Sequence, residues 1–124
     1  MDKQISRVSV GPMSKEVIDA AIQYANDKDC IVTLIPSRRQ IDWNGGYVGM
    51  TTMQLSEYCR QQSKNIRIQR DHGGPHQGEV DDVGFDSFYW DAKGFDSIHI
   101  DPFRLKNFSR AVIATVGYID FCLK

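Results

Sequence analysis

The chain has 124 residues, a length that fits one domain large enough to bury a hydrophobic core. Its composition, 41% hydrophobic and 25% charged, is that of an ordinary globular domain. The formal net charge of −1 provides no electrostatic basis for binding nucleic acid or an anionic membrane surface, so we expect neither partner.

The cysteines and the first residues predict a cytoplasmic location. Cys30, Cys59 and Cys122 are odd in number and form no Cys-x-x-Cys pair, so we expect reduced thiols that fill apolar space. Asp2 and Lys3 stand where a signal peptide would need apolar residues, and no apolar stretch approaches membrane-spanning length.

The first half of the chain predicts two strand–helix units. Ile5–Val10 alternates in a way that suits a short strand, and Ser14 can cap a helix whose apolar residues recur at helical spacing. The run Cys30–Ile35 is apolar at both odd-numbered and even-numbered positions, as in a strand buried on both faces of a parallel sheet. Thr51 and Gln54 then form a capping box that opens the second helix.

The second half predicts two further units. Ile66–Arg70 suits a third strand, and a loop then leads to a helix expected over roughly Asp82 to Lys93, with Gly94 past its end. Ser97–Asp101 suits a fourth strand, and an amphipathic helix is expected from Asn107 onward.

Strands that alternate with helices predict a parallel sheet with right-handed crossovers. Two architectures fit, a four-stranded open sheet or half of a (β/α)8 barrel, since a full barrel needs about 250 residues. Polar residues gather at the predicted strand ends, which is the rim where barrel chemistry occurs. We therefore expect the α/β class and one domain over residues 1–124, a (β/α)4 half of a TIM-type barrel.

Two strand ends carry the candidate catalytic and binding residues. Asp71 and His72 precede two glycines, and they reach one ligand only where the strand has already turned into loop. A pair of hydrogen-bonding loop residues is the simpler alternative. His99 and Asp101 share parity and can both point inward, or His99 can be a buried histidine satisfied by a neighbouring strand.

Three other residues are candidates for binding a ligand. Arg38, with Arg39, can clamp a phosphate, although the sequence favours a solvated or salt-bridged pair at the rim. Gly45 and Gly46 can line a ligand, or they can serve a turn that needs positive φ.

Three segments carry a resemblance to a known family. Asn44–Thr51, Asp71–Pro75 and Ile98–Asp101 occur in an order and spacing similar to the class II tagatose-bisphosphate aldolase family. The match is best to its large subunit, the non-catalytic or chaperone-like one. The resemblance covers nearly the whole chain but only the N-terminal half of the family's barrel.

The resemblance implies zinc-dependent aldol chemistry on phosphorylated ketoses. In catalytic members an Asp-His pair ends the third strand, where the Asp donates a proton and the His is one of three zinc ligands. Asp71 and His72 match that pair. The family's other zinc ligands and its phosphate-binding glycine loop belong to the half of the barrel that this chain does not match.

These observations predict a carbohydrate-metabolism protein that binds a sugar phosphate or supports a catalytic aldolase partner. The alternatives are a non-catalytic half-barrel assembly module and a truncated aldolase-like copy. Catalytic zinc needs three protein ligands, and we expect His72 to have help only from His99 or Asp101. Zinc is therefore expected to bind weakly or not at all, with negligible aldol cleavage by the isolated chain.

A four-stranded piece of barrel also predicts self-association. It leaves two edge strands and, on this interpretation, exposes inward apolar residues, namely Ile35, Ile68 and Ile100. Two half-barrels related by a two-fold axis close both edges at once. We expect a homodimer or a complex with a second half-barrel or aldolase subunit.

Overall fold

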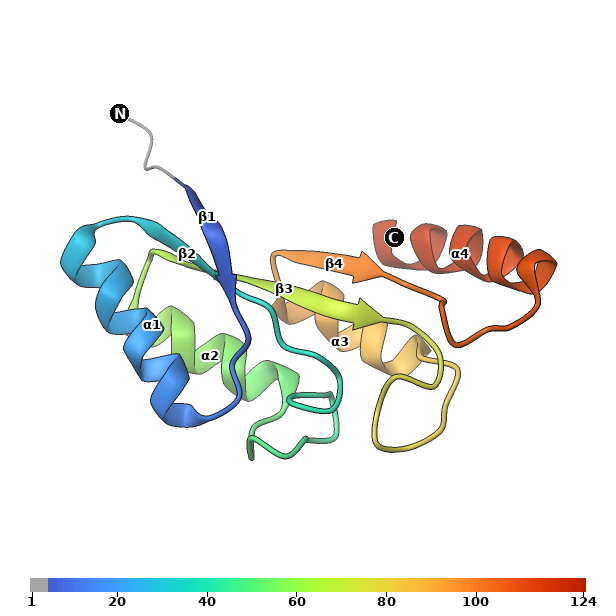
Figure 1. Cartoon of the computed structure of the whole chain (residues 1–124), viewed down its shortest axis with the longest axis horizontal. Coiled ribbons are helices and arrows are strands. Elements are labelled where there is room, and N and C mark those ends of the chain that lie inside the picture. The colour runs from blue at the N-terminus through green and yellow to red at the C-terminus, as the bar shows by residue number, and fades with distance from the viewer. Residues whose placement is uncertain (1–4) are drawn as a thin grey trace.

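The computed structural model describes residues 5–124, so Asp2 and Lys3 lie outside the described residues. The strands are β1 (Ile5–Val10), β2 (Ile31–Leu34), β3 (Ile66–Gly73) and β4 (Ser97–Ile100). The helices are α1 (Lys15–Lys28), α2 (Thr52–Gln62), α3 (Phe85–Gly94) and α4 (Phe108–Leu123). All neighbouring strands pair in parallel, in the order β1-β2-β3-β4 (Figure 1). This is the predicted α/β architecture, consistent with a (β/α)4 half of a barrel.

Local capping residues fix three of the helix starts, and the sequence predicts the first two of them. The Ser14 side chain accepts a hydrogen bond from the Val17 N–H at the start of α1. Thr51 and Gln54 form the complete capping box of α2. Asn107 caps α4 in the same way. Each of these caps satisfies backbone N–H groups that the first helical turn leaves without partners.

The start of α3 differs from the prediction. The helix begins at Phe85 rather than Asp82, and Gly94 is its last residue rather than a residue beyond its end. Asp82 lies in the loop before the helix, where its carboxylate accepts two hydrogen bonds from Arg38, each 2.7 Å long. The preceding residue is instead Gly84, whose φ of 90° is a conformation that glycine adopts without strain.

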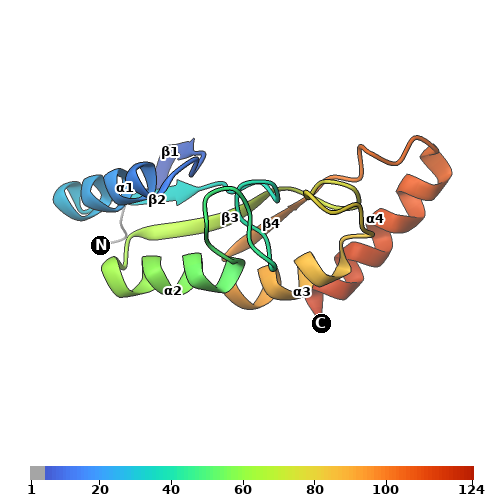
Figure 2. The ribbon, with the colours of Figure 1, turned by 90° about the horizontal axis from the view of Figure 1, so that it is seen from below.

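The helices cover one face of the sheet, and Figure 2 shows α2 and α3 side by side beneath it. Val32, Leu34 and Ile68 point toward the helices and belong to one hydrophobic core with Ile18 of α1 and Leu55 of α2. Because helices cover a single face, only alternate residues of β2 are buried. The prediction that this strand is buried on both faces is therefore wrong.

The opposite face of the sheet is largely polar. The register pairs Thr33 with Arg67 and Gln69 with Ser97 on that face, where the Ser97 hydroxyl donates to the Gln69 side chain. Ile68 is fully buried on the helix side, and Ile100 lines a groove beside α4. The prediction that Ile68 and Ile100 are exposed inward is therefore wrong, and self-association needs another basis.

Cys59 is one of the apolar filler residues that the sequence predicts. It is fully buried in the core, and this burial raises the pKa of its thiol to about 11. Cys30 and Cys122 are half-buried and, like Cys59, form no disulfide. Within residues 5–124, no helix combines the length and apolar character needed to cross a membrane.

Candidate functional site

An irregularity at the end of β3 places Asp71 and His72 together. β3 continues three residues beyond the predicted end at Arg70, and its register with β4 shifts between Arg70 and Gly73. His72 takes a φ of 49°, which is uncommon for a residue with a side chain. The bulge breaks the simple alternation of side chains, and the Asp71 carboxylate lies 3.9 Å from His72 Nε2.

The end of β4 completes a cluster of four polar side chains with the end of β3. The Asp101 carboxylate lies 2.7 Å from His72 Nδ1. The His72 backbone N–H donates to His99 Nδ1 at 3.3 Å, and the Asp71 carboxylate lies 3.7 Å from that same nitrogen. The structure therefore brings together the four residues that the sequence predicts at these two strand ends.

The hydrogen bonds determine which atoms of this cluster are available to a ligand. A carboxylate only accepts, so neutral His72 carries its proton on Nδ1 toward Asp101 and presents the lone pair of Nε2. Neutral His99 accepts at Nδ1 and therefore carries its proton on Nε2. The His72 and His99 side chains are 49% and 43% exposed, so a ligand from solvent can reach both rings.

The donor set of the cluster fits a metal ion. One ligand atom each from Asp71, His72 and His99 lies within 4.8 Å of the others. A carboxylate and two imidazoles suit zinc once His99 gives up either the hydrogen bond that it accepts at Nδ1 or the proton on Nε2. The contact between Asp101 and His72 is the arrangement that orients a metal-binding imidazole.

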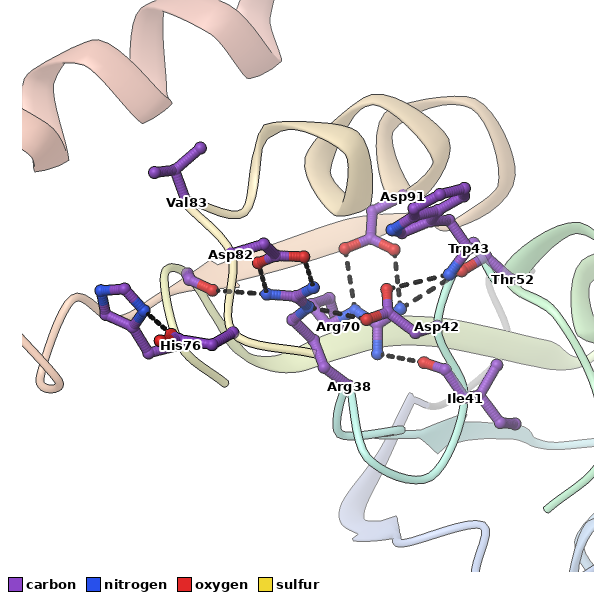
Figure 3. Close-up of polar contacts among 12 residues, drawn as sticks. Arg38, Ile41, Asp42, Trp43, Thr52, Arg70, His76, Asp82, Val83 and Asp91 are labelled. Carbon is purple, nitrogen blue, oxygen red and sulfur yellow. Dashed lines mark hydrogen bonds and ion pairs between the residues drawn. The ribbon is translucent and has the colours of Figure 1, made fainter. Parts of the chain in front are cut away.

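Arg38 lies apart from this cluster as an internal tie between two loops (Figure 3). It is 2% exposed, and its Nε donates to the Asp42 carboxylate at 2.9 Å. Its other nitrogens donate to Asp82 and to the Gly74 carbonyl, the latter at 2.9 Å. The two carboxylates raise the pKa of Arg38 despite the opposing effect of burial. The structure therefore presents Arg38 as a buried ion-paired residue, and its four hydrogen bonds face inward.

Gly45 serves a turn that needs positive φ, which was one of the two interpretations of the sequence, whereas Gly46 does not have a positive φ. Gly45 has a φ of 97° and its N–H donates to the Asp42 carbonyl at 3.0 Å. A Cβ added at Gly46 would lie 2.3 Å from the Gln40 carbonyl oxygen. The close backbone approach explains Gly46, and the positive φ explains Gly45.

Arg70 and Asp91 form a buried ion pair that sequence reasoning missed (Figure 3). Arg70 donates from Nε and Nη2 to the two Asp91 oxygens, each at 2.8 Å, and both side chains are fully buried. Burial raises the pKa of the Asp91 carboxyl, and the Arg70 guanidinium opposes that shift. Arg70 shares parity with Ile66 and Ile68, which was the available signal that it points into the core.

The same arginine braces the strand end that carries the cluster. Arg70 Nη1 donates to the carbonyls of Pro36 and Ile41, at 3.1 Å and 2.6 Å. These bonds connect β3 to the segment after β2. They are made by Arg70, the residue directly before Asp71. The Asp71 N–H also donates to the Pro36 carbonyl, at 2.9 Å. Three hydrogen bonds therefore hold Arg70 and Asp71 against the segment that follows β2.

Comparison with known proteins shows the fold. No protein-family model matches the chain, and no curated protein sequence matches it significantly. Among solved structures, the chain is similar to a probable tagatose 6 phosphate kinase from Sinorhizobium meliloti 1021, with a TM-score of 0.62 and 20% sequence identity. The similarity covers 96% of this chain and 36% of that protein, so the chain spans about a third of its structural neighbour's length.

Proposed function

We propose that this chain acts in carbohydrate metabolism by binding a phosphorylated ketose at the cluster of Asp71, His72, His99 and Asp101. The observation that carries the proposal is the convergence of these four side chains at the ends of β3 and β4. In barrels of this architecture, the C-terminal ends of the strands are where ligands bind. A cytoplasmic location belongs to the same proposal.

Two similarities support the substrate class. The motifs Asn44–Thr51, Asp71–Pro75 and Ile98–Asp101 resemble a family named for tagatose bisphosphate. The structural neighbour is described as a probable kinase of tagatose 6-phosphate. Both names refer to phosphorylated tagatose, and we extend that substrate class to this chain.

The chemistry of the cluster suits a polyhydroxylated ligand. The carboxylate of Asp71 and the lone pair of His72 Nε2 can each accept a hydrogen bond from a sugar hydroxyl. The protonated Nε2 of His99 can donate to an oxygen of the ligand. We assign Asp71 the proton-transfer role that the resemblance implies and His72 the contact to a hydroxyl or a metal ion.

Tagatose 6-phosphate should raise the melting temperature of the protein. A ligand at 100 times its Kd stabilises the folded state by about 2.7 kcal/mol, which is a shift of several degrees for a domain of this size. The shift should disappear in His72→Ala and persist in His76→Ala. His76 pairs with Asp81 in an exposed loop outside the cluster, so it is the matched control. The absence of any shift at millimolar ligand in the wild-type protein would contradict a sugar-phosphate site.

Support of a catalytic aldolase subunit is the second candidate function, favoured by the resemblance to the large subunit. On this proposal, the isolated chain binds zinc weakly and cleaves no aldol. Asp71, His72 and His99 are at least 32% exposed, so water competes for the ion. Metal analysis of chelator-washed protein should find well below one zinc per chain. Stoichiometric zinc that is lost in His72→Ala would overturn this expectation and favour a working enzyme.

A further inference from the structure

The terminal helix presents an apolar stripe to solvent. Tyr118 is the one residue of α4 whose side chain is buried. Five apolar residues of α4 recur at intervals of four, four, three and four positions, which places them on one face of the helix. They are between 45% and 87% exposed: Phe108, Val112, Val116, Ile119 and Leu123. We call this set the α4 stripe. A continuous exposed apolar surface of this kind marks an interaction site.

The α4 stripe continues onto the edge of the sheet. β4 is the last strand in the sheet order, and α4 lies beside it at one end of the molecule (Figure 1). A groove of about 300 Å³ lies between β4, α3 and α4. Its apolar lining includes Phe95, Ile98, Ile100, Ile119, Cys122 and Leu123. In a barrel, this is the place where the next strand and helix pack.

The opposite edge of the molecule carries a smaller apolar strip. β1 is the first strand in the sheet order, and α1 follows it. Met13, just before α1, is 60% exposed, and Tyr24 of α1 is 57% exposed. Val17 is half-buried and lies seven residues before Tyr24, which places these two residues on one face of α1. We call these three residues the α1 strip.

We propose that the α4 stripe binds the α1 strip of a second copy of this chain. A two-fold axis then repeats the contact, so that β4 of each copy lies parallel to β1 of the other and an eight-stranded barrel closes. A second copy is the occupant we infer because this one chain carries both edges that the closure needs. The proposal does not depend on the proposed ligand.

Charge complementarity supports the same pairing. The segment from Lys106 to Lys124 contains three cations and one anion, a net charge of +2. The segment from Lys15 to Asp29 contains two cations and four anions, a net charge of −2. Opposite charges favour the pairing of α4 with α1 of the partner over the pairing of α4 with itself.

Sedimentation velocity of the full chain over a range of concentrations tests the proposal. The wild-type protein should form a dimer, and Val116→Glu should raise the dissociation constant of that dimer at least tenfold. Ile113→Glu is the matched control, because Ile113 is 73% exposed on the same helix but lies off the stripe. On the other edge, Tyr24→Glu should weaken the dimer, and its neighbour Gln23→Glu should not. Val112→Glu repeats the test at a second position, and circular dichroism checks that each variant is folded.

Mixing two variants distinguishes barrel closure from other dimers. In a mixed dimer of Val116→Glu with Tyr24→Glu, one of the two interfaces carries both changes and the other carries neither. The mixture should therefore dimerise better than either variant alone. A wild-type monomer at all concentrations would overturn the proposal, as would a dimer that Val116→Glu leaves intact. A dimer weakened by Val116→Glu but not by Tyr24→Glu would show that α4 packs on itself.

Discussion

Asp91→Ala should lower the free energy of unfolding by about 3–5 kcal/mol, the usual cost of removing one partner of a buried ion pair. Arg70 would keep its charge in a fully buried position while losing the two 2.8 Å hydrogen bonds to the carboxylate. Urea denaturation measures the change. Asp120→Ala is the matched control, since Asp120 pairs with Lys124 on the surface and is 66% exposed. Its effect should stay within about 0.5 kcal/mol.

A double variant separates the cost of a stranded charge from the loss of packing. Arg70→Met combined with Asp91→Leu removes both charges and keeps apolar volume, so it should be less destabilised than Asp91→Ala. If Asp91→Ala unfolds at the same urea concentration as Asp120→Ala, the buried ion pair contributes nothing to stability and our description of this brace is wrong.

Arg38→Ala should lower the free energy of unfolding by about 3 kcal/mol, because it strands the Asp42 carboxylate. Asp42 is 3% exposed and accepts the hydrogen bond from Arg38 Nε. Arg39→Ala is the control, because Arg39 is the exposed neighbour of Arg38 in the same turn.

The same residue can be tested for a direct role in binding phosphate. Asp82→Asn weakens the contact between Arg38 and residue 82 without removing the Arg38 guanidinium. If Arg38 only positions the chain after His72, both variants should reduce the thermal shift caused by sugar phosphate to a similar extent. A reduction confined to Arg38→Ala would mean that Arg38 contacts the phosphate itself.

The features predicted from the sequence are those that local chemistry determines. Ser14 and Thr51 with Gln54 cap helices through bonds that span three residues, so their neighbours along the chain are enough to identify them. The start of α3 depends on a contact between residues 44 positions apart, the one between Arg38 and Asp82. Tertiary contacts of this kind leave no local pattern.

In the candidate site too, the sequence predicts what local chemistry determines and misses what depends on tertiary contacts. His99 and Asp101 could be placed beside Asp71 from strand parity, because the ends of neighbouring parallel strands meet at one rim. The bulge at His72 that makes the cluster possible is a property of the pairing between β3 and β4. Arg38 was predicted either to clamp a phosphate or to be solvated or salt-bridged at the rim, and its two carboxylate partners become visible only in the folded chain.

The sheet order also has a consequence for how the chain opens. Every strand pairs only with strands that neighbour it in the sequence, so the four units form a short linear stack. In such a stack each unit is stabilised mainly by the next one, as in repeat proteins. The central strands β2 and β3 have partners on both sides, whereas β4 and α4 have them on one. In the monomer, where β1 and β4 are both edge strands, local unfolding should therefore begin in the end units, and the amide protons of α4 should exchange with solvent before those of β3.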